Sequence, residues 1–154
     1  MSENGFYDST DDTRRHCREV WRCIQQIRDE LGPRAWDHDL SKLNPPEKEG
    51  FDRATMRLRT LTYSSDEYKA ALADLKPTLD HHYAENRHHP EHFKNGVDGM
   101  TLIDIIEMFC DWKAATLRHE NGDFGESIEL NQTRFNLSDQ LTSIFRNTKD
   151  ALGW

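Results

Sequence analysis

Apolar residues recur at helical spacing along most of the chain. Over residues 11–31 they fall on one face at Val20, Ile24 and Ile27, three or four positions apart, which predicts an amphipathic helix. Acidic residues at positions 11 and 12 suit the start of this helix, and Gly32-Pro33 should end it. The first long element is therefore expected to be a helix of about 20 residues.

Further start and stop signals divide the rest of the chain into helices. Ser64 and Glu67 have capping-box spacing, and the helix that follows runs through a kink at Pro77 towards His82. Thr101 opens the most apolar segment, which should run to about residue 119. Helices are also expected near 46–61, 126–134 and 138–152, with a loop over 87–99. Since strand-like alternation is absent, the prediction is one all-α domain of about six helices over 11–154, after a flexible arm at 1–10.

The net charge and the distribution of apolar residues make some functions and locations of the protein less expected than others. The net charge of −8 disfavours nonspecific binding to nucleic acid or to a membrane surface, although metals or local cations can still hold a phosphate. No apolar run is long enough to span a bilayer, and the polar N-terminus does not resemble a secretory signal, so a cytoplasmic protein is expected. Cys17, Cys23 and Cys110 form no metal-binding pair and are expected as buried or half-buried free thiols.

Histidine is the unusual residue of this sequence. Five of the eight histidines fall between positions 81 and 92, in the pairs His81-His82 and His88-His89 and at His92. A solvated loop explains His92 and His119 well, but the two pairs are rich in metal ligands. The sequence therefore predicts a metal centre that draws on this segment.

A second motif with ligand chemistry is His38-Asp39-Leu40-Ser41-Lys42. An adjacent histidine and aspartate can give one ion a nitrogen and an oxygen ligand, although such dipeptides also occur by chance. Lys42, three residues past the aspartate, is suited to contact a bound phosphate as a point charge.

Acidic residues follow one stripe of the helix that begins near Thr101. Asp104, Glu107 and Asp111 lie three or four positions apart among apolar residues, and a buried carboxylate needs a partner. For Asp104 an arginine from another helix is as good an expectation as a metal. Asp111 is expected to be the more deeply buried of the two and to be a ligand.

In order along the chain, His16, His38-Asp39 and Asp111 resemble the H…HD…D signature of the HD-domain superfamily. Residues 38–42 are similar to the HDxGK motif of the HD-GYP branch, and His81-His82 through Pro90 partly match its HHE-to-GYP segment. The match departs from that branch where His88-His89 replace Gly-Tyr, Ser41 replaces glycine and Ala114 stands for the second aspartate. The chain is also similar to small HD-like proteins of phages and bacteria.

This resemblance implies a metal-dependent phosphohydrolase or phosphodiesterase that acts on a nucleotide or a related phosphoester. It implies one or two divalent ions, from among Mn, Fe, Co, Ni, Zn and Mg. The expected metal ligands are His16, His38, Asp39, His81, His82, His88, His89 and Asp111. The expected catalytic residues are Lys42 and Arg118, which would stabilise charge on the phosphate, and Glu107 and Asp104, either of which could be the general base. The expected substrate-binding residues are Arg15, Arg18 and Lys113.

Two other functions fit the same residues. The order of the histidines and aspartates can also be that of an HD-fold diiron oxygenase, and an HD-like scaffold without catalysis could bind a nucleotide or a protein. The apolar residues of the last helix, with Trp154, suggest a homodimer.

Overall fold

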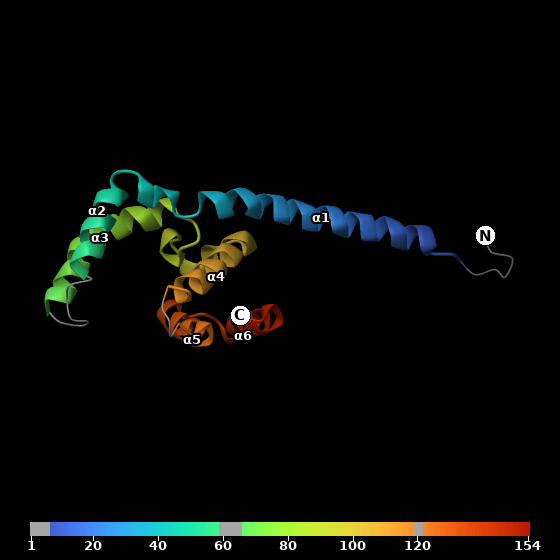
Figure 1. Cartoon of the computed structure of the whole chain (residues 1–154). Helices are drawn as coiled ribbons and strands as arrows, with labels where there is room; N and C mark the ends of the chain where they lie inside the picture. Colours follow the sequence, from blue (N-terminus) through green and yellow to red (C-terminus); the bar gives the residue numbers. More distant parts are fainter. Residues whose placement is uncertain (1–6, 59–65, 119–121) are drawn as a thin grey trace. The chain divides into compact units, whose positions relative to one another are not determined.

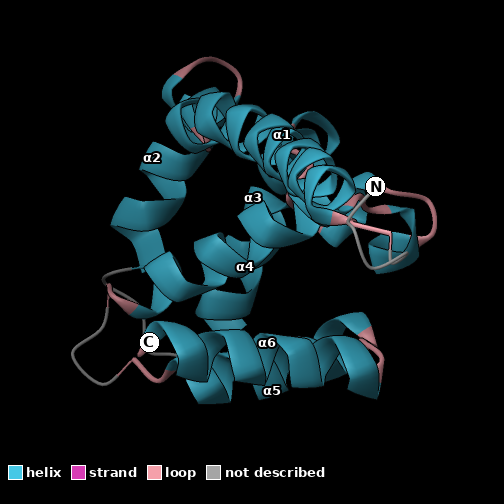
Figure 2. Ribbon diagram, turned by 90° about the vertical axis from the view of Figure 1, so that its right-hand side faces the viewer, coloured by secondary structure: helices cyan, strands magenta, loops and turns pink. Residues whose placement is uncertain are grey.

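The computed structural model describes residues 7–58, 66–118 and 122–154. These residues form six α-helices and three short 3-10 helices, and they contain no strand (Figure 2). The all-α prediction is therefore confirmed. The chain divides into two compact units, Met1–Trp36 and Asp37–Trp154, where the sequence suggested a single domain. No described helix is both long and apolar enough to cross a membrane.

The first unit consists almost entirely of helix α1, Thr10–Asp37. The helix passes through Gly32-Pro33 without ending, so the predicted end at these residues is wrong. A proline inside a helix removes one backbone hydrogen bond, and the bonds of the turns on either side carry the helix past it. The side chains of α1 are mostly exposed, including Cys17 and Cys23. Cys110 in the second unit is exposed as well, so the three thiols are free but not buried.

The second unit begins with a 3-10 helix, Leu40–Leu43, and a helical hairpin of α2, Glu47–Leu58, and α3, Asp66–Glu85 (Figure 1). The two helices approach closely at Gly50, where an added Cβ would lie 2.0 Å from Oγ1 of Thr78. Helix α3 continues through Pro77, and the predicted cap at Ser64 lies outside the described residues.

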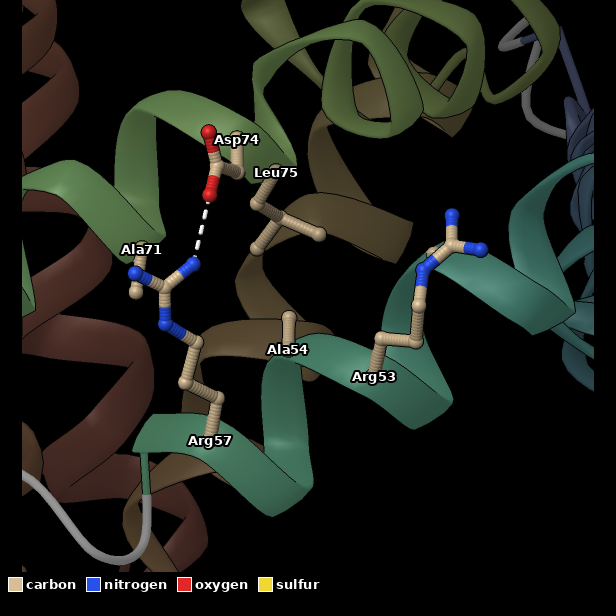
Figure 3. A pocket seen from close by; sticks show the side chains of 7 residues that line it. Arg53, Ala54, Arg57, Ala71, Asp74 and Leu75 are labelled. Carbon is tan, nitrogen blue, oxygen red and sulfur yellow. Dashed lines mark hydrogen bonds and ion pairs between the residues drawn. The ribbon is translucent and has the colours of Figure 1, made fainter.

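A cavity of about 180 Å³ lies between α2 and α3 (Figure 3). Its floor is formed by small apolar side chains of both helices, among them Ala54 and Ala71, and Arg57 donates a hydrogen bond to Asp74 at its rim at 2.5 Å. None of the metal-ligand candidates lines this cavity.

Helices α4, Leu102–Thr116, α5, Phe124–Phe135, and α6, Asp139–Leu152, follow two 3-10 helices at Pro90–His92 and Gly96–Gly99. Helix α5 packs against both α4 and α6. The apolar core between them contains Met108, Phe109, Trp112, Phe124, Ile128, Leu137 and Phe145. Trp154 stacks on Phe109 with ring centroids 5.7 Å apart. Phe145 is buried in this core, whereas Trp154 is 37% exposed and Ile144 is 51% exposed, so the expected homodimer stays a prediction.

Helix α4 begins with the capping box that Thr101 and Asp104 predicted. The Asp104 side chain is fully buried, and both its oxygens accept hydrogen bonds from Arg87, at 3.1 and 3.0 Å. Asp104 is thus more buried than Asp111, whose side chain is 22% exposed, which reverses the expectation from sequence. The alternative partner named for Asp104, an arginine, is the correct one, and its carboxylate is occupied by structural contacts.

We expect Arg87→Ala to lower the free energy of unfolding by about 3 kcal/mol, because it removes the guanidinium group that donates two hydrogen bonds to the buried carboxylate of Asp104. Urea denaturation of the metal-free protein measures this change. Arg146→Ala is the matched control, since it breaks an arginine–carboxylate pair with Glu129 that lies on the surface, and it should have little effect. Equal stability of the two variants would contradict the structural role of Asp104.

Candidate metal centre

Two overlapping groups of side chains in the second unit could hold a metal ion. One contains Asp39, His82, His88 and His89, and the other contains His38, His88 and Asp111. In each group the ligand atoms lie within 4.8 Å of one another. His88 belongs to both groups, so the six residues form one cluster, which we call the His/Asp cluster.

Four segments of the chain supply the His/Asp cluster. His38 and Asp39 lie just after α1, His82 lies near the end of α3, His88 and His89 precede the 3-10 helix at Pro90–His92, and Asp111 lies on α4. Asp39 has a φ of 60° and a ψ of 10°, in the left-handed region. Aspartate adopts this conformation more readily than most residues, and strained backbone of this kind is common at functional sites.

The atoms of the first group converge on the Oδ1 oxygen of Asp39. This oxygen lies 3.2 Å from Nε2 of His82 and 3.5 Å from Nε2 of His88. Among the described residues, neither Asp39 Oδ1 nor His88 Nε2 has a hydrogen-bond partner, although both atoms are buried. Buried polar atoms are almost always satisfied, so these two need a ligand that attracts lone pairs. A cation has that property.

The second group brings His38 and Asp111 together. Nε2 of His38 lies 3.4 Å from Oδ1 of Asp111 and 3.6 Å from the other oxygen of Asp39, Oδ2. The first group is closed by His89, whose Nε2 lies 2.9 Å from Nε2 of His82. One carboxylate oxygen of Asp39, Oδ1, therefore lies beside the histidines of the first group, and the other, Oδ2, lies beside His38 of the second group.

Two further carboxylates lie behind the imidazoles. Oε1 of Glu107 is 3.1 Å from Nδ1 of His38 and 3.2 Å from Nδ1 of His88. Oε2 of Glu47 is 2.8 Å from Nδ1 of His82, and the Glu47 side chain is fully buried. Three imidazoles thus have a carboxylate on one ring nitrogen while the other nitrogen faces the cluster.

The electrostatics of the metal-free cluster reflect this crowding. Hydrogen bonds to Asp111 and Glu107 raise the pKa of His38 from 6.5 to about 10. Burial lowers the pKa of His89 to about 3, with help from the nearby His88 and His82. Burial alone would raise the pKa of Glu107, but the hydrogen bonds from His38 and His88 outweigh it and hold the value at about 2. Without a metal, His38 therefore carries a positive charge at neutral pH and His89 carries none.

The sequence model of a family of unknown function, DUF5662, matches residues 5–151. The chain belongs to the DUF5662 family. No curated protein and no solved structure matches it significantly. The family description assigns no chemistry, so the chemistry of this DUF5662 protein has to be argued from its own residues.

Six of the eight predicted ligands form the His/Asp cluster. His81 belongs to neither group; it lies on the partly exposed side of α3, and its Nδ1 bonds Oε1 of Glu47 at 2.9 Å. His16 is exposed on α1, in the first unit, and belongs to neither group. Its part in metal binding stays a prediction.

The predicted catalytic residues divide in the same way. Lys42 lies at the cluster, with its Nζ 2.6 Å from Oδ2 of Asp39. The contacts of Glu107 support a position behind the ligands instead of the expected role as general base. Asp104 is bound to Arg87, and Arg118 is exposed beyond the end of α4.

Among the predicted substrate-binding residues, Lys113 belongs to the same unit as the cluster, and the part of Arg15 and Arg18, on α1 of the first unit, stays a prediction. Lys113 lies two positions after Asp111, on the opposite side of α4, and its Nζ is over the ring of Phe124. Arg15 pairs with Asp12 on α1, and Arg18 is exposed on the same helix. His92, expected in a solvated loop, is half-buried and bonds the carbonyl of Tyr83 at 3.1 Å, while His119 lies outside the described residues.

Sequence reasoning missed Glu47 and Asn86. Glu47 follows two prolines at the start of a helix, where an acidic residue is ordinarily explained by the helix dipole. Asn86 donates hydrogen bonds to Oγ of Ser41 at 2.9 Å and to the carbonyl of His82 at 2.8 Å. Only the pairing of α2 with α3 reveals that both side chains support His82.

The raised pKa of His38 predicts how the stability of the metal-free protein depends on pH. A group whose pKa rises on folding stabilises the folded state below its unfolded pKa, near 6.5, and loses that contribution as the pH rises to about 10. We therefore expect the free energy of unfolding to fall between pH 6.5 and 10. Chemical denaturation across this range measures it. His38→Gln should remove this part of the slope, and an unchanged slope in that variant would contradict the assignment.

Proposed function

We propose that this DUF5662 protein is a metal-dependent phosphohydrolase that acts on a nucleotide or a related phosphoester, and that it works in the cytoplasm. The observation that carries the proposal is a pair of buried ligand atoms, Asp39 Oδ1 and His88 Nε2, that have no hydrogen-bond partner in the described part of the chain and are surrounded by further ligand atoms. A hydrogen-bonded core would not leave both atoms unsatisfied in the same place.

The donor set fits a divalent transition metal. Four imidazole nitrogens and the oxygens of two aspartates suit Mn, Fe, Co, Ni or Zn better than Mg, which prefers oxygen ligands alone. A divalent ion held there would lower the pKa of a bound water and polarise a phosphoryl oxygen. Asp39 with His82, His88 and His89 would hold one ion, and His38 with Asp111 extends the donor set towards a second.

One side of the His/Asp cluster is open to a substrate. The side chains of His82 and His88 are only 2% exposed, whereas those of His38, Asp111 and Lys42 are 26%, 22% and 32% exposed. A phosphoester would therefore approach over His38 and Asp111. The chain supplies a cation on this side, because the ammonium of Lys42 can leave Asp39 and bind a phosphate oxygen.

A hydrolysis screen tests the proposal. The purified protein would be stripped of metal and loaded in turn with Mn, Fe, Co, Ni, Zn and Mg. Release of phosphate or of a nucleoside product would be measured with nucleoside mono- and triphosphates and with cyclic dinucleotides. We expect turnover with at least one transition metal and none after chelation. Metal binding without turnover across all substrates would contradict hydrolysis and favour a binding module.

The abundance of nitrogen ligands supports one other function. Four histidines and two aspartates would also suit a pair of iron ions in an oxygenase. The iron-loaded protein distinguishes the two, since an oxygenase would show a mixed-valent iron spectrum and consume oxygen with an organic substrate. The hydrolase should do neither.

A further inference from the structure

We propose that Glu107 and Glu47 are positioning residues that fix the ring orientation and tautomer of three imidazoles, and that metal affinity depends on both. This inference rests on the proposed metal centre. It concerns two side chains that belong to neither group of ligands, and it gives Glu107 a different role from that of a general base.

Glu107 acts on both groups of ligands through one oxygen. Its Oε1 lies at hydrogen-bond distance from Nδ1 of His38 and from Nδ1 of His88. An ionised carboxylate can only accept hydrogen bonds, so both Nδ1 atoms must carry the proton. The lone pair of each neutral ring is then on Nε2, the atom that faces Asp39 or Asp111. His38 belongs to the second group and His88 to both, so loss of Glu107 affects the whole cluster.

Glu47, at the start of α2, fixes the tautomer of His82 in the same way. Its carboxylate is fully buried and accepts from Nδ1 of His82 at 2.8 Å, from Nδ1 of His81 at 2.9 Å and from the hydroxyl of Ser41 at 2.8 Å. Three donors on one carboxylate hold it firmly in its ionised form. Nε2 of His82 is thereby left to face Oδ1 of Asp39.

The consequence is a measurable change in affinity. A metal-binding imidazole must present a lone pair in a fixed direction, and a carboxylate on its other nitrogen enforces this and makes the ring more basic. Removing such a partner lowers metal affinity by about 10- to 100-fold. Glutamine retains the size of glutamate but lacks its charge, and it can also donate, so it holds the protonated Nδ1 less well.

Zinc affinity of Glu107→Gln and Glu47→Gln, measured by competition with a chromophoric chelator, tests the proposal. Each variant should bind zinc about 10- to 100-fold more weakly than the unaltered protein. Glu49→Gln is the matched control, because Glu49 is exposed in the first turn of the same helix as Glu47, and it should bind normally.

Nitrogen-15 NMR of the zinc-loaded protein supplies a readout that simple loss of packing would not give. We expect His38, His82 and His88 to bind zinc through Nε2 and to keep a slowly exchanging proton on Nδ1. In Glu107→Gln that proton should exchange faster on His38 and His88 and not on His82. In Glu47→Gln it should exchange faster on His82, and on His81, which also contacts Glu47, but not on His38 or His88.

Three outcomes would overturn the inference. Zinc bound through Nδ1 would contradict the tautomers, and normal affinity in both variants would contradict the positioning role while leaving the proposed function intact. Failure of the unaltered protein to bind any metal would overturn the metal centre and this inference together.

Discussion

Asp39→Asn should lower metal affinity by more than about 100-fold, which is the upper limit of the effect of removing a partner behind a ligand. The substitution neutralises the carboxylate on which the first ligand group converges and whose other oxygen lies 3.6 Å from Nε2 of His38 in the second group. Asparagine also tolerates a positive φ, so the backbone at this position should be retained. Isothermal titration with zinc and with manganese measures the change, and turnover should disappear with it.

The control for this variant is Asp37→Asn, which removes a charge from an exposed residue two positions earlier. It should bind metal as the unaltered protein does. Retention of tight metal binding in Asp39→Asn would contradict the central place of Asp39, whatever its effect on stability.

Lys42→Ala should lower the turnover of a phosphoester by roughly 100-fold, by analogy with the loss of one electrostatic group at a reacting centre. Metal affinity should not fall, because Lys42 is a cation 2.6 Å from an oxygen of Asp39 and its removal leaves that carboxylate more negative. Steady-state kinetics beside a metal titration separate the two effects.

Lys48→Ala is the matched control for this experiment, since Lys48 pairs with Asp52 on the exposed surface of α2. Its turnover should be unchanged. If Lys42→Ala instead lost metal and kept full turnover per bound ion, the role of Lys42 as a phosphate contact would be wrong.

Local signals predicted the helices well where the chain itself determines them. Helices α4 and α6 begin, as predicted, near Thr101 and Ser138, where the side chains of these two residues cap the helices through contacts that form within one turn. The helix end predicted at Pro33 is wrong because a proline destabilises a helix by only a limited free energy, and a long helix can tolerate the loss of one backbone hydrogen bond.

The ligands could be predicted because their chemistry shows in their residue types. Histidine pairs and a His-Asp dipeptide are uncommon enough to be noticed, and most of them converge. What the sequence could not separate was His81 from His82, adjacent histidines that both bond Glu47. The full burial of Asp104 depends on its contact with Arg87, and the role of Glu47 depends on its contact with His82. Both partners are distant in the sequence, so no local pattern could predict these contacts.

The convergence of Asp39 and His88 on one cation is tested most directly by anomalous X-ray scattering from crystals of the metal-loaded protein. We expect an anomalous peak within about 2.0–2.2 Å of both Asp39 Oδ1 and His88 Nε2, with His82 or His89 as a further ligand. A fully loaded crystal in which these two atoms bind only water or each other, with the metal elsewhere, would contradict the account.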